Sequence, residues 1–281
     1  LIPEHSKKLM DNFIKRNDYK HKNFSDKLLK FSQNGTSNNS LFEFNQTISE
    51  LNKFGVVHKW YDYLEDFPYQ LIEEKIKEYE LKPNSLIVEP FAGSGTTLIS
   101  ANLFNCNAIG FDANPLMTFI SETKTTWDID LDLFKDNIKS ISTKFVEGIR
   151  NYDNLKLDKG FLDRMPKKEL NQWLSPSLQK NLIDKIDNIK IKNLPLIAIS
   201  KSCFDASYVS LCPGTTFYPF REKDGFWDLF TSKIIQIYND LQSIQKYNHY
   251  GKSQLINDSC LNASNYIEKD TIDFIITSPP Y

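Results

Sequence analysis

Residues 85–97 read Ser85-Leu86-Ile87-Val88-Glu89-Pro90-Phe91-Ala92-Gly93-Ser94-Gly95-Thr96-Thr97, a short apolar run that leads into two closely spaced glycines. The run is typical of a buried strand, and residues 97–105 follow with apolar side chains at helical spacing. Residues 107–112 form a second short apolar run. A strand, a glycine turn, a helix and a second strand in this order predict a parallel sheet of the α/β class.

The glycine turn has the features of a cofactor loop. Glycine permits positive φ and close approach of a ligand, and the start of a helix presents unpaired N–H groups. A P-loop would need a lysine directly after the glycines, and a dinucleotide fingerprint would need a third glycine where Leu98 stands. The pattern disfavours both and favours S-adenosylmethionine, a nucleoside cofactor without phosphates. The alternative is a tight turn with a purely structural role.

Two carboxylates flank this turn at positions that suit such a cofactor. Asp112 ends the second predicted strand, where an acid can bind ribose hydroxyls. Glu89 ends the first strand and can face the positively charged amino end of the cofactor. We assign both residues to the cofactor pocket, together with Asn114.

A second motif, Ser278-Pro279-Pro280-Tyr281, follows the apolar run at residues 272–277. Prolines cannot donate backbone hydrogen bonds, so the carbonyl groups of this turn can face a ligand. The amino group of a nucleobase is a poor nucleophile, because its lone pair is delocalised into the ring. Ser278 Oγ and the Pro279 carbonyl can accept its protons, and Tyr281 can stack on a flipped base. The alternative is a proline-rich strand exit.

These motifs resemble those of bacterial DNA amino-methyltransferases. The cofactor motif of that family reads [Asp/Glu]-Pro-Phe-x-Gly-[Ser/Thr]-Gly-Thr-Thr, and its catalytic motif reads [Asp/Asn/Ser]-Pro-Pro-[Tyr/Phe]. The resemblance implies a Rossmann-like methyltransferase sheet, S-adenosylmethionine as cofactor, DNA as partner, and a place in a restriction–modification or defence system. It implies catalytic roles for Ser278, Pro279, Pro280 and Tyr281, and cofactor contacts from Glu89, Pro90, Phe91, Ala92, Gly93, Ser94, Gly95, Thr96 and Thr97.

The resemblance extends to two further segments. Residues 58–68 are similar to the stretch that precedes the cofactor motif, which implies that Trp60, Tyr63 and Phe67 line the pocket; core packing is the alternative. Asp258 resembles the acid after the third strand that contacts the adenine amino group.

In this family, serine at the first catalytic position usually accompanies methylation of cytosine N4, and aspartate or asparagine that of adenine N6. Ser278 therefore favours cytosine, although many members with this motif carry the two motifs in the reverse order. Two alternatives stay open: an RNA guanine-N2 or protein-glutamine methyltransferase, and a cofactor-binding subunit without catalytic activity. Enzymes of the first kind usually have aspartate or asparagine where Ser278 stands.

The chain is expected to contain four parts. These are an N-terminal helical segment (1–55), the cofactor-binding α/β part (56–130), a helical insertion (131–250) and a return to the sheet (251–281). Helices are predicted at 130–149, 176–191, 194–206 and 226–247. The four strands would have the order 3-2-1-4, with residues 272–277 at an open edge. We therefore expect further polypeptide, as a C-terminal continuation or a second chain, to complete the sheet.

Bulk properties narrow the function classes only slightly. The formal net charge of −2 gives no overall basic character, so nucleic-acid binding would have to use a local basic face. The four cysteines form no Cys-x-x-Cys pair, which argues against a zinc site and a disulfide framework. Membrane spans and a signal peptide are not recognisable, and a reducing cytoplasm is the expected location.

Overall fold

A computed structural model of the chain describes residues 55–61, 68–150, 180–206, 209–210, 216–217 and 226–278. These residues fall into two compact units. The described residues of 130–234 form what we call the helical unit, and those of 55–129 and 235–278 form the sheet unit. In the described part of the chain, none of the helices has the length and apolar character needed to cross a membrane.

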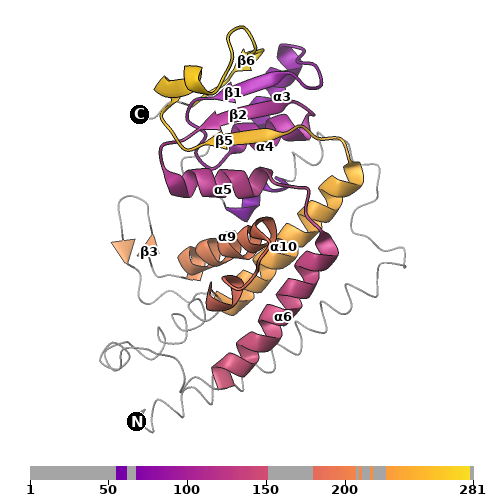
Figure 1. Ribbon diagram of the computed structural model, residues 1–281, viewed down its shortest axis with the longest axis vertical. Coiled ribbons are helices and arrows are strands. Elements are labelled where there is room, and N and C mark those ends of the chain that lie inside the picture. Colours follow the sequence, from indigo (N-terminus) through magenta and orange to yellow (C-terminus); the bar gives the residue numbers. More distant parts are fainter. Residues whose placement is uncertain are drawn as a thin grey trace. The chain divides into compact units, whose positions relative to one another are not determined.

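The sheet unit is built on a parallel sheet of four strands in the order β5-β2-β1-β6 (Figure 1). This order confirms the predicted arrangement 3-2-1-4 and the α/β, Rossmann-like fold class. The strands are β1 (Leu86–Glu89), β2 (Asn107–Phe111), β5 (Ser253–Ile256) and β6 (Phe274–Ile275).

Strand β6 lies at the edge of the described sheet, next to β1. Ile87 pairs with Phe274 and Val88 with Ile275. The Asp273 carboxylate fixes this register, because it accepts a 2.7 Å hydrogen bond from Leu86 N. Ile275 is 56% exposed, so an apolar side chain of the edge strand faces solvent in this structure.

Two helices cover one face of the sheet. Helix α3 (Tyr69–Glu78) presents Ile72 and Ile76, and helix α4 (Thr96–Leu103) is buried along its whole length. Their side chains pack on Ile87 of β1 and Ala108 of β2 in one apolar cluster. No face of α4 meets water, which is consistent with the absence of charged residues from this helix, although Thr96, Thr97, Ser100 and Asn102 are polar and buried.

The opposite face of the sheet has a second, smaller apolar cluster. Val88, Phe111 and Ile256 form its centre, and the 3₁₀-helix η4 (Cys260–Asn265) packs against it. Helix α5 (Pro115–Thr125) follows β2 and lies beside β5 and α4. The carboxyl ends of β1, β2 and β5 therefore lead into the glycine turn, α5 and η4 at one edge of the sheet (Figure 1).

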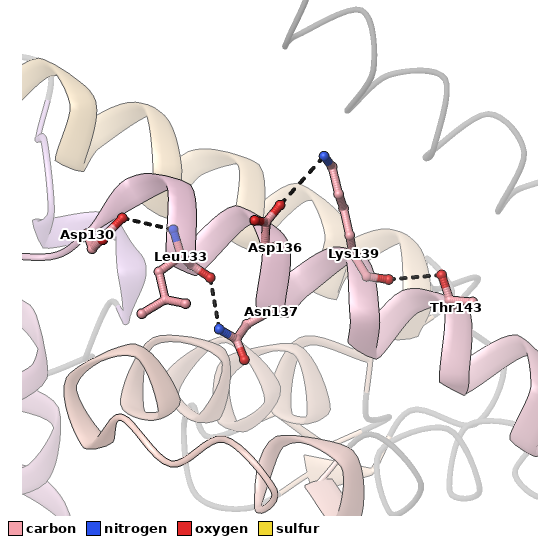
Figure 2. Close-up of polar contacts among 6 residues, drawn as sticks. All are labelled: Asp130, Leu133, Asp136, Asn137, Lys139 and Thr143. Carbon is pink, nitrogen blue, oxygen red and sulfur yellow. Dashed lines mark hydrogen bonds and ion pairs between the residues drawn. The ribbon is translucent and has the colours of Figure 1, made fainter.

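The first part of the helical unit is α6 (Leu131–Arg150), in agreement with the predicted helix at 130–149. Figure 2 shows its polar contacts: Asp130 Oδ1 accepts from Leu133 N at 2.8 Å and caps the first turn. Further along, Asn137 donates to the Leu133 carbonyl, and Lys139 pairs with Asp136 at 3.8 Å. These contacts stay within the helix, while Phe134, Ile138 and Ile141 form its buried stripe.

Helix α9 (Ile189–Ala206) corrects the predicted boundaries. The expected helices 176–191 and 194–206 were separated just before Pro195, but the break lies earlier, at residues 184–188. Asn188 caps α9, because its side chain accepts from Ile191 N at 3.2 Å. Pro195 lies inside the helix, where it removes one backbone hydrogen bond without ending the helix. The short strands β3 (Val209–Ser210) and β4 (Thr216–Phe217) pair antiparallel after it.

Helix α10 (Phe226–Tyr247) matches the predicted helix 226–247, and its residues from Ile235 onward belong to the sheet unit. Gln245 Nε2 donates to the carbonyls of Trp127 at 2.9 Å and Ile129 at 2.6 Å. The Gln245 side chain thus connects residues 127–129, where the chain leaves the sheet unit, to α10, on which the chain returns.

Candidate functional site

The glycine turn between β1 and α4 is held by backbone hydrogen bonds on both sides. Ala92 N donates to the Phe111 carbonyl of β2, and Gly95 N donates to the Ala92 carbonyl, both at 2.8 Å. Gly95 is the N-cap of α4 with φ +89°, and Gly93 has φ +52°. Both values favour glycine, which explains the two glycines of the motif.

The two glycines face different surroundings. A Cβ atom on Gly95 would lie 2.3 Å from Ser121 Oγ of α5, so this glycine allows close packing of the turn on the protein. A Cβ atom on Gly93 would meet no heavy atom within 4 Å. The backbone at Gly93 therefore borders open space, as the approach of a ligand requires.

The Asp112 carboxylate links this turn to the start of α5. Its Oδ2 accepts from Gly93 N and its Oδ1 accepts from Asn114 N, both at 2.8 Å. The Asn114 side chain in turn caps α5 by accepting from Leu116 N at 2.9 Å. Asp112 and Asn114 therefore lie beside the glycine turn. Their contact with a cofactor stays a prediction.

Glu89 is buried at the carboxyl end of β1, with 1% of its surface exposed. Burial raises the pKa of its carboxyl group, and hydrogen bonds from Thr277, Thr97 and the Phe91 amide partly oppose this shift. Thr97 Oγ1 donates to Oε2 at 2.7 Å, and Phe91 N donates to Oε1 at 3.1 Å. The carboxylate thus joins the end of β1, the first turn of α4 and the segment after β6.

The remaining residues of the motif divide by exposure. Phe91 is 45% exposed and Pro90 is half-buried, whereas Ala92 is buried. The side chains of Ser94, Thr96 and Thr97 are buried and point away from solvent. Phe91 and Gly93 therefore form the solvent-facing side of the turn. The hydroxyl groups of the motif lie on its buried side.

Ser94 has a partner that sequence reasoning missed. Lys124 of α5 is fully buried, and its Nζ lies 3.3 Å from Ser94 Oγ and 3.2 Å from the Tyr61 carbonyl. The available signal was a lysine at an inward position of an amphipathic helix, three residues after Ser121, where an apolar side chain is the norm.

Trp60, in the 3₁₀-helix η2 (His58–Trp60), is completely buried. Its indole Nε1 donates to Asp240 Oδ2 at 2.8 Å, and the same oxygen accepts from Val57 N at 3.0 Å. These contacts give Trp60 a packing role in this structure, and its contact with a cofactor stays a prediction. Tyr63 and Phe67 lie outside the described residues.

Asp258 follows β5, and its carboxylate is held by its own neighbourhood. It accepts from Ser259 N at 2.7 Å, from Asn262 Nδ2 at 3.0 Å and from the Tyr266 hydroxyl at 2.9 Å. The Asn262 and Tyr266 hydrogen bonds, in that order, lower the pKa of Asp258. Tyr266 was not singled out from the sequence, and its ring also meets Phe111 edge-on.

Ser278 lies two residues beyond Ile276, whose backbone N donates to the Val88 carbonyl at 3.1 Å. Because β6 runs parallel to β1, Ser278 leaves the sheet at the same edge as Glu89. Thr277, directly before it, hydrogen-bonds with the Glu89 carboxylate. The structure therefore brings the start of the second motif beside the first, while Pro279, Pro280 and Tyr281 lie outside the described residues.

Comparison with known proteins gives consistent matches. A family model described as DNA methylase, of the N6 and N4 type, matches residues 5–122. The Type II methyltransferase M.BsoBI of Geobacillus stearothermophilus is 27% identical over 263 residues, which cover 83% of this chain and 50% of that protein. M.MvaI of Kocuria varians is 25% identical over 277 residues, covering 90% and 58%. M.MjaII of Methanocaldococcus jannaschii is 35% identical over 77 residues, covering 27% and 14%.

The fold, the glycine turn with its two acids and these matches together indicate a Rossmann-like methyltransferase. Proteins of this class use S-adenosylmethionine as the methyl donor. More closely, the family model and the Type II methyltransferases that match support the bacterial DNA amino-methyltransferase family, which the two motifs suggested. It spans about half the length of the first relatives named.

The residues present fit the cofactor that this family implies. Gly93 leaves open space at the turn, and three carboxylates, those of Glu89, Asp112 and Asp258, lie at the carboxyl ends of β1, β2 and β5. A ligand with an ammonium, a sulfonium and a ribose is matched by such a set of acceptors.

Proposed function

We propose that the protein to which this chain belongs is a DNA methyltransferase of a restriction–modification system, which transfers a methyl group from S-adenosylmethionine to an exocyclic base amine. The observation that carries the proposal is the parallel pairing of β6 with β1, in which Ile276 N donates to the Val88 carbonyl at 3.1 Å. It ties the cofactor turn to the strand that leads into Ser278. A methyl donor held at Gly93 and a base held at Ser278 would then meet at one edge of the sheet.

The chemistry assigned to the second motif concerns two protons. The Ser278 hydroxyl and the Pro279 carbonyl accept hydrogen bonds from the amino group of the base. This favours a pyramidal nitrogen, whose lone pair is free to attack the methyl group. When bound, S-adenosylmethionine would supply the methyl group: the N–CH₃ bond would form as the S–CH₃ bond breaks, the thioether would be the leaving group, and one amino proton would pass to solvent. Tyr281 supplies an aromatic face for the base, as enzymes that flip bases require.

Cytosine N4 is the proposed target atom, in preference to adenine N6. The support is the serine at position 278, where family members that act on adenine usually carry aspartate or asparagine. Two of the matched relatives are named Type II methyltransferases without a target base in their names. The base assignment therefore rests on Ser278 alone.

The experiment is transfer of a tritiated methyl group to plasmid DNA by the complete protein, followed by separation of the nucleosides. Recovery of N4-methylcytosine is expected. Recovery of N6-methyladenine would overturn the base assignment, and label confined to RNA or protein would overturn the proposed substrate. Ser278→Ala and Tyr281→Ala should abolish transfer and leave cofactor binding within about twofold of the unmodified protein. Ser140→Ala, an exposed serine of α6, is the matched control and should retain full transfer.

We also propose that the working sheet continues past β6 with further polypeptide. The support is the exposed Ile275 on the edge of the described sheet, together with the greater length of the matched relatives. The Asp273–Leu86 contact fixes the register of β6 against β1, on the side away from this open edge. Amide hydrogen exchange at Ile275 should be slower in the complete protein than in residues 1–281 alone. Equal exchange in both would contradict this.

A further inference from the structure

We propose that Lys124 is a positioning residue, which holds the glycine turn and the segment around Tyr61 in the arrangement that binds the cofactor. The proposal rests on the proposed S-adenosylmethionine site and adds a residue outside the two motifs. Lys124 lies near the end of α5, and none of its surface is exposed.

The first support is the pair of acceptors that Lys124 reaches. Its ammonium group donates to Ser94 Oγ at 3.3 Å and to the Tyr61 carbonyl at 3.2 Å. Ser94 stands between the two glycines of the turn, and Tyr61 directly follows Trp60. A single buried charge thus bridges two segments that lie 33 residues apart in sequence and that both belong to the predicted cofactor pocket.

The second support is the way α5 packs beneath the turn. Ser121, one helical turn before Lys124, leaves no room for a Cβ atom on Gly95. The same face of α5 therefore meets the turn at two consecutive residues, by close packing at Gly95 and by a hydrogen bond at Ser94. The Trp127 indole donates to the Lys124 carbonyl at 2.6 Å and fixes the end of this helix.

The third support is the electrostatic effect on His58. Burial and, after it, the charge of Lys124 lower the pKa of His58 well below its ordinary value. His58 stacks on Tyr69 with ring centroids 4.4 Å apart, so it is fixed in place and neutral. The Lys124 ammonium group therefore acts on both segments: it donates a hydrogen bond to the glycine turn, and its charge lowers the pKa of His58 in η2.

Burial of an ammonium group lowers the stability of the folded protein unless the group is fully hydrogen-bonded. A lysine that served only to fill space here would therefore be destabilising. Methionine would fill the same volume without that cost. The presence of a charged lysine is explained if the hydrogen bonds of its ammonium group set the conformation of the turn before the cofactor binds.

The test uses five variants of the complete protein, two single changes, their combination and two controls, with S-adenosylmethionine affinity measured by calorimetry. Lys124→Met should raise the Kd about tenfold, the range expected for loss of a charged hydrogen bond. Ser94→Ala, which removes the acceptor, should raise it in the same direction. The two changes together should be clearly less than additive, because they break one interaction.

Two matched controls separate positioning from general stability. Lys201→Met removes another buried lysine, which pairs with Asp205 in the helical unit. Ser100→Ala removes a buried hydroxyl of α4 that has no hydrogen-bond partner in the described structure. Both should leave the Kd unchanged, even where the melting temperature falls. In steady-state assays Lys124→Met should raise KM for the cofactor and keep kcat at saturation.

A ligand-free measurement completes the design. Amide NMR resonances of Gly93 and Gly95 should shift in Lys124→Met and in Ser94→Ala, and stay in place in Ser100→Ala. Unchanged resonances, unchanged affinity or strictly additive effects would each overturn the proposal. If Lys124→Met fails to fold, Ser94→Ala decides alone. If the unmodified protein binds no S-adenosylmethionine, the proposed function fails, while the resonance shifts still report on the positioning role.

Discussion

The Thr97 hydroxyl donates a 2.7 Å hydrogen bond to the buried Glu89 carboxylate, across the glycine turn that separates β1 from α4. The two residues thereby connect the two ends of the cofactor motif. Thr97→Val keeps the shape of the side chain and removes the donor. The free energy of unfolding should fall by about 1.5–3 kcal/mol, because a buried charged acceptor loses a partner. Urea denaturation measures this, with Thr125→Val on α5 as the control of smaller effect.

Glu89 should also make stability depend on pH. Burial raises its pKa in the folded protein above the ordinary value of 4.5, while the unfolded chain keeps that value. The folded state therefore holds its proton to higher pH, and the Glu89 contribution to stability falls as pH rises through the folded pKa. Glu89→Gln removes the titration. The stability of the unmodified protein relative to Glu89→Gln should decline as pH increases above 4.5, and a constant difference across that range would contradict it.

Asp112 is expected to matter for the cofactor more than for the fold. Asp112→Asn keeps one oxygen acceptor but removes the charge and one of the two acceptors that serve Gly93 N and Asn114 N. Cofactor affinity should drop by roughly tenfold or more, in line with loss of a charged hydrogen bond. Calorimetric titration with S-adenosylmethionine measures the change. Asp136→Asn, on the exposed side of α6, should bind as the unmodified protein does.

Three glycines should respond differently to alanine. At Gly93 the added methyl group meets no atom within 4 Å, so the cost is the positive φ, about 1–2 kcal/mol, plus weakened cofactor binding. At Gly251 a Cβ atom would lie 1.8 Å from the Cys106 carbonyl oxygen, which is backbone and cannot move aside. Gly251→Ala should therefore prevent folding of the sheet unit, and Gly95→Ala should fall between the two. Circular dichroism melts rank the three variants, and a well-folded Gly251→Ala protein would contradict the order.

Much of the sheet could be predicted because its strands are short apolar runs that end in distinctive turns. The order 3-2-1-4 followed from the resemblance to the methyltransferase family, whose sheet has this arrangement, and β5-β2-β1-β6 matches it. The start of α9 could not be predicted in the same way. The boundary was expected next to Pro195, but Pro195 lies inside the helix and Asn188 provides the cap. A proline marks a helix end only by tendency, and tertiary packing decides whether the helix continues.

The candidate site was predictable where its residues belong to a motif and hidden where it depends on distant contacts. Gly93 and Asp112 meet as expected. Lys124 and Tyr266 acquire their roles from partners that are distant in sequence or brought close by a local turn, and nothing in the spacing of a single sequence announces such pairs. The inward position of Lys124 on α5 was the one readable sign.

The two hydrogen bonds from Gln245 to the carbonyls of Trp127 and Ile129 have a consequence for the loop closure of the sheet unit. They close the sheet unit at a neck through which the chain departs near residue 129 and returns on α10. Gly251 then crosses the Cys106 carbonyl and leads straight into β5. The two contacts hold the exit and the return of the chain together, so the register of the sheet unit does not depend on the length of the segment between residues 129 and 235.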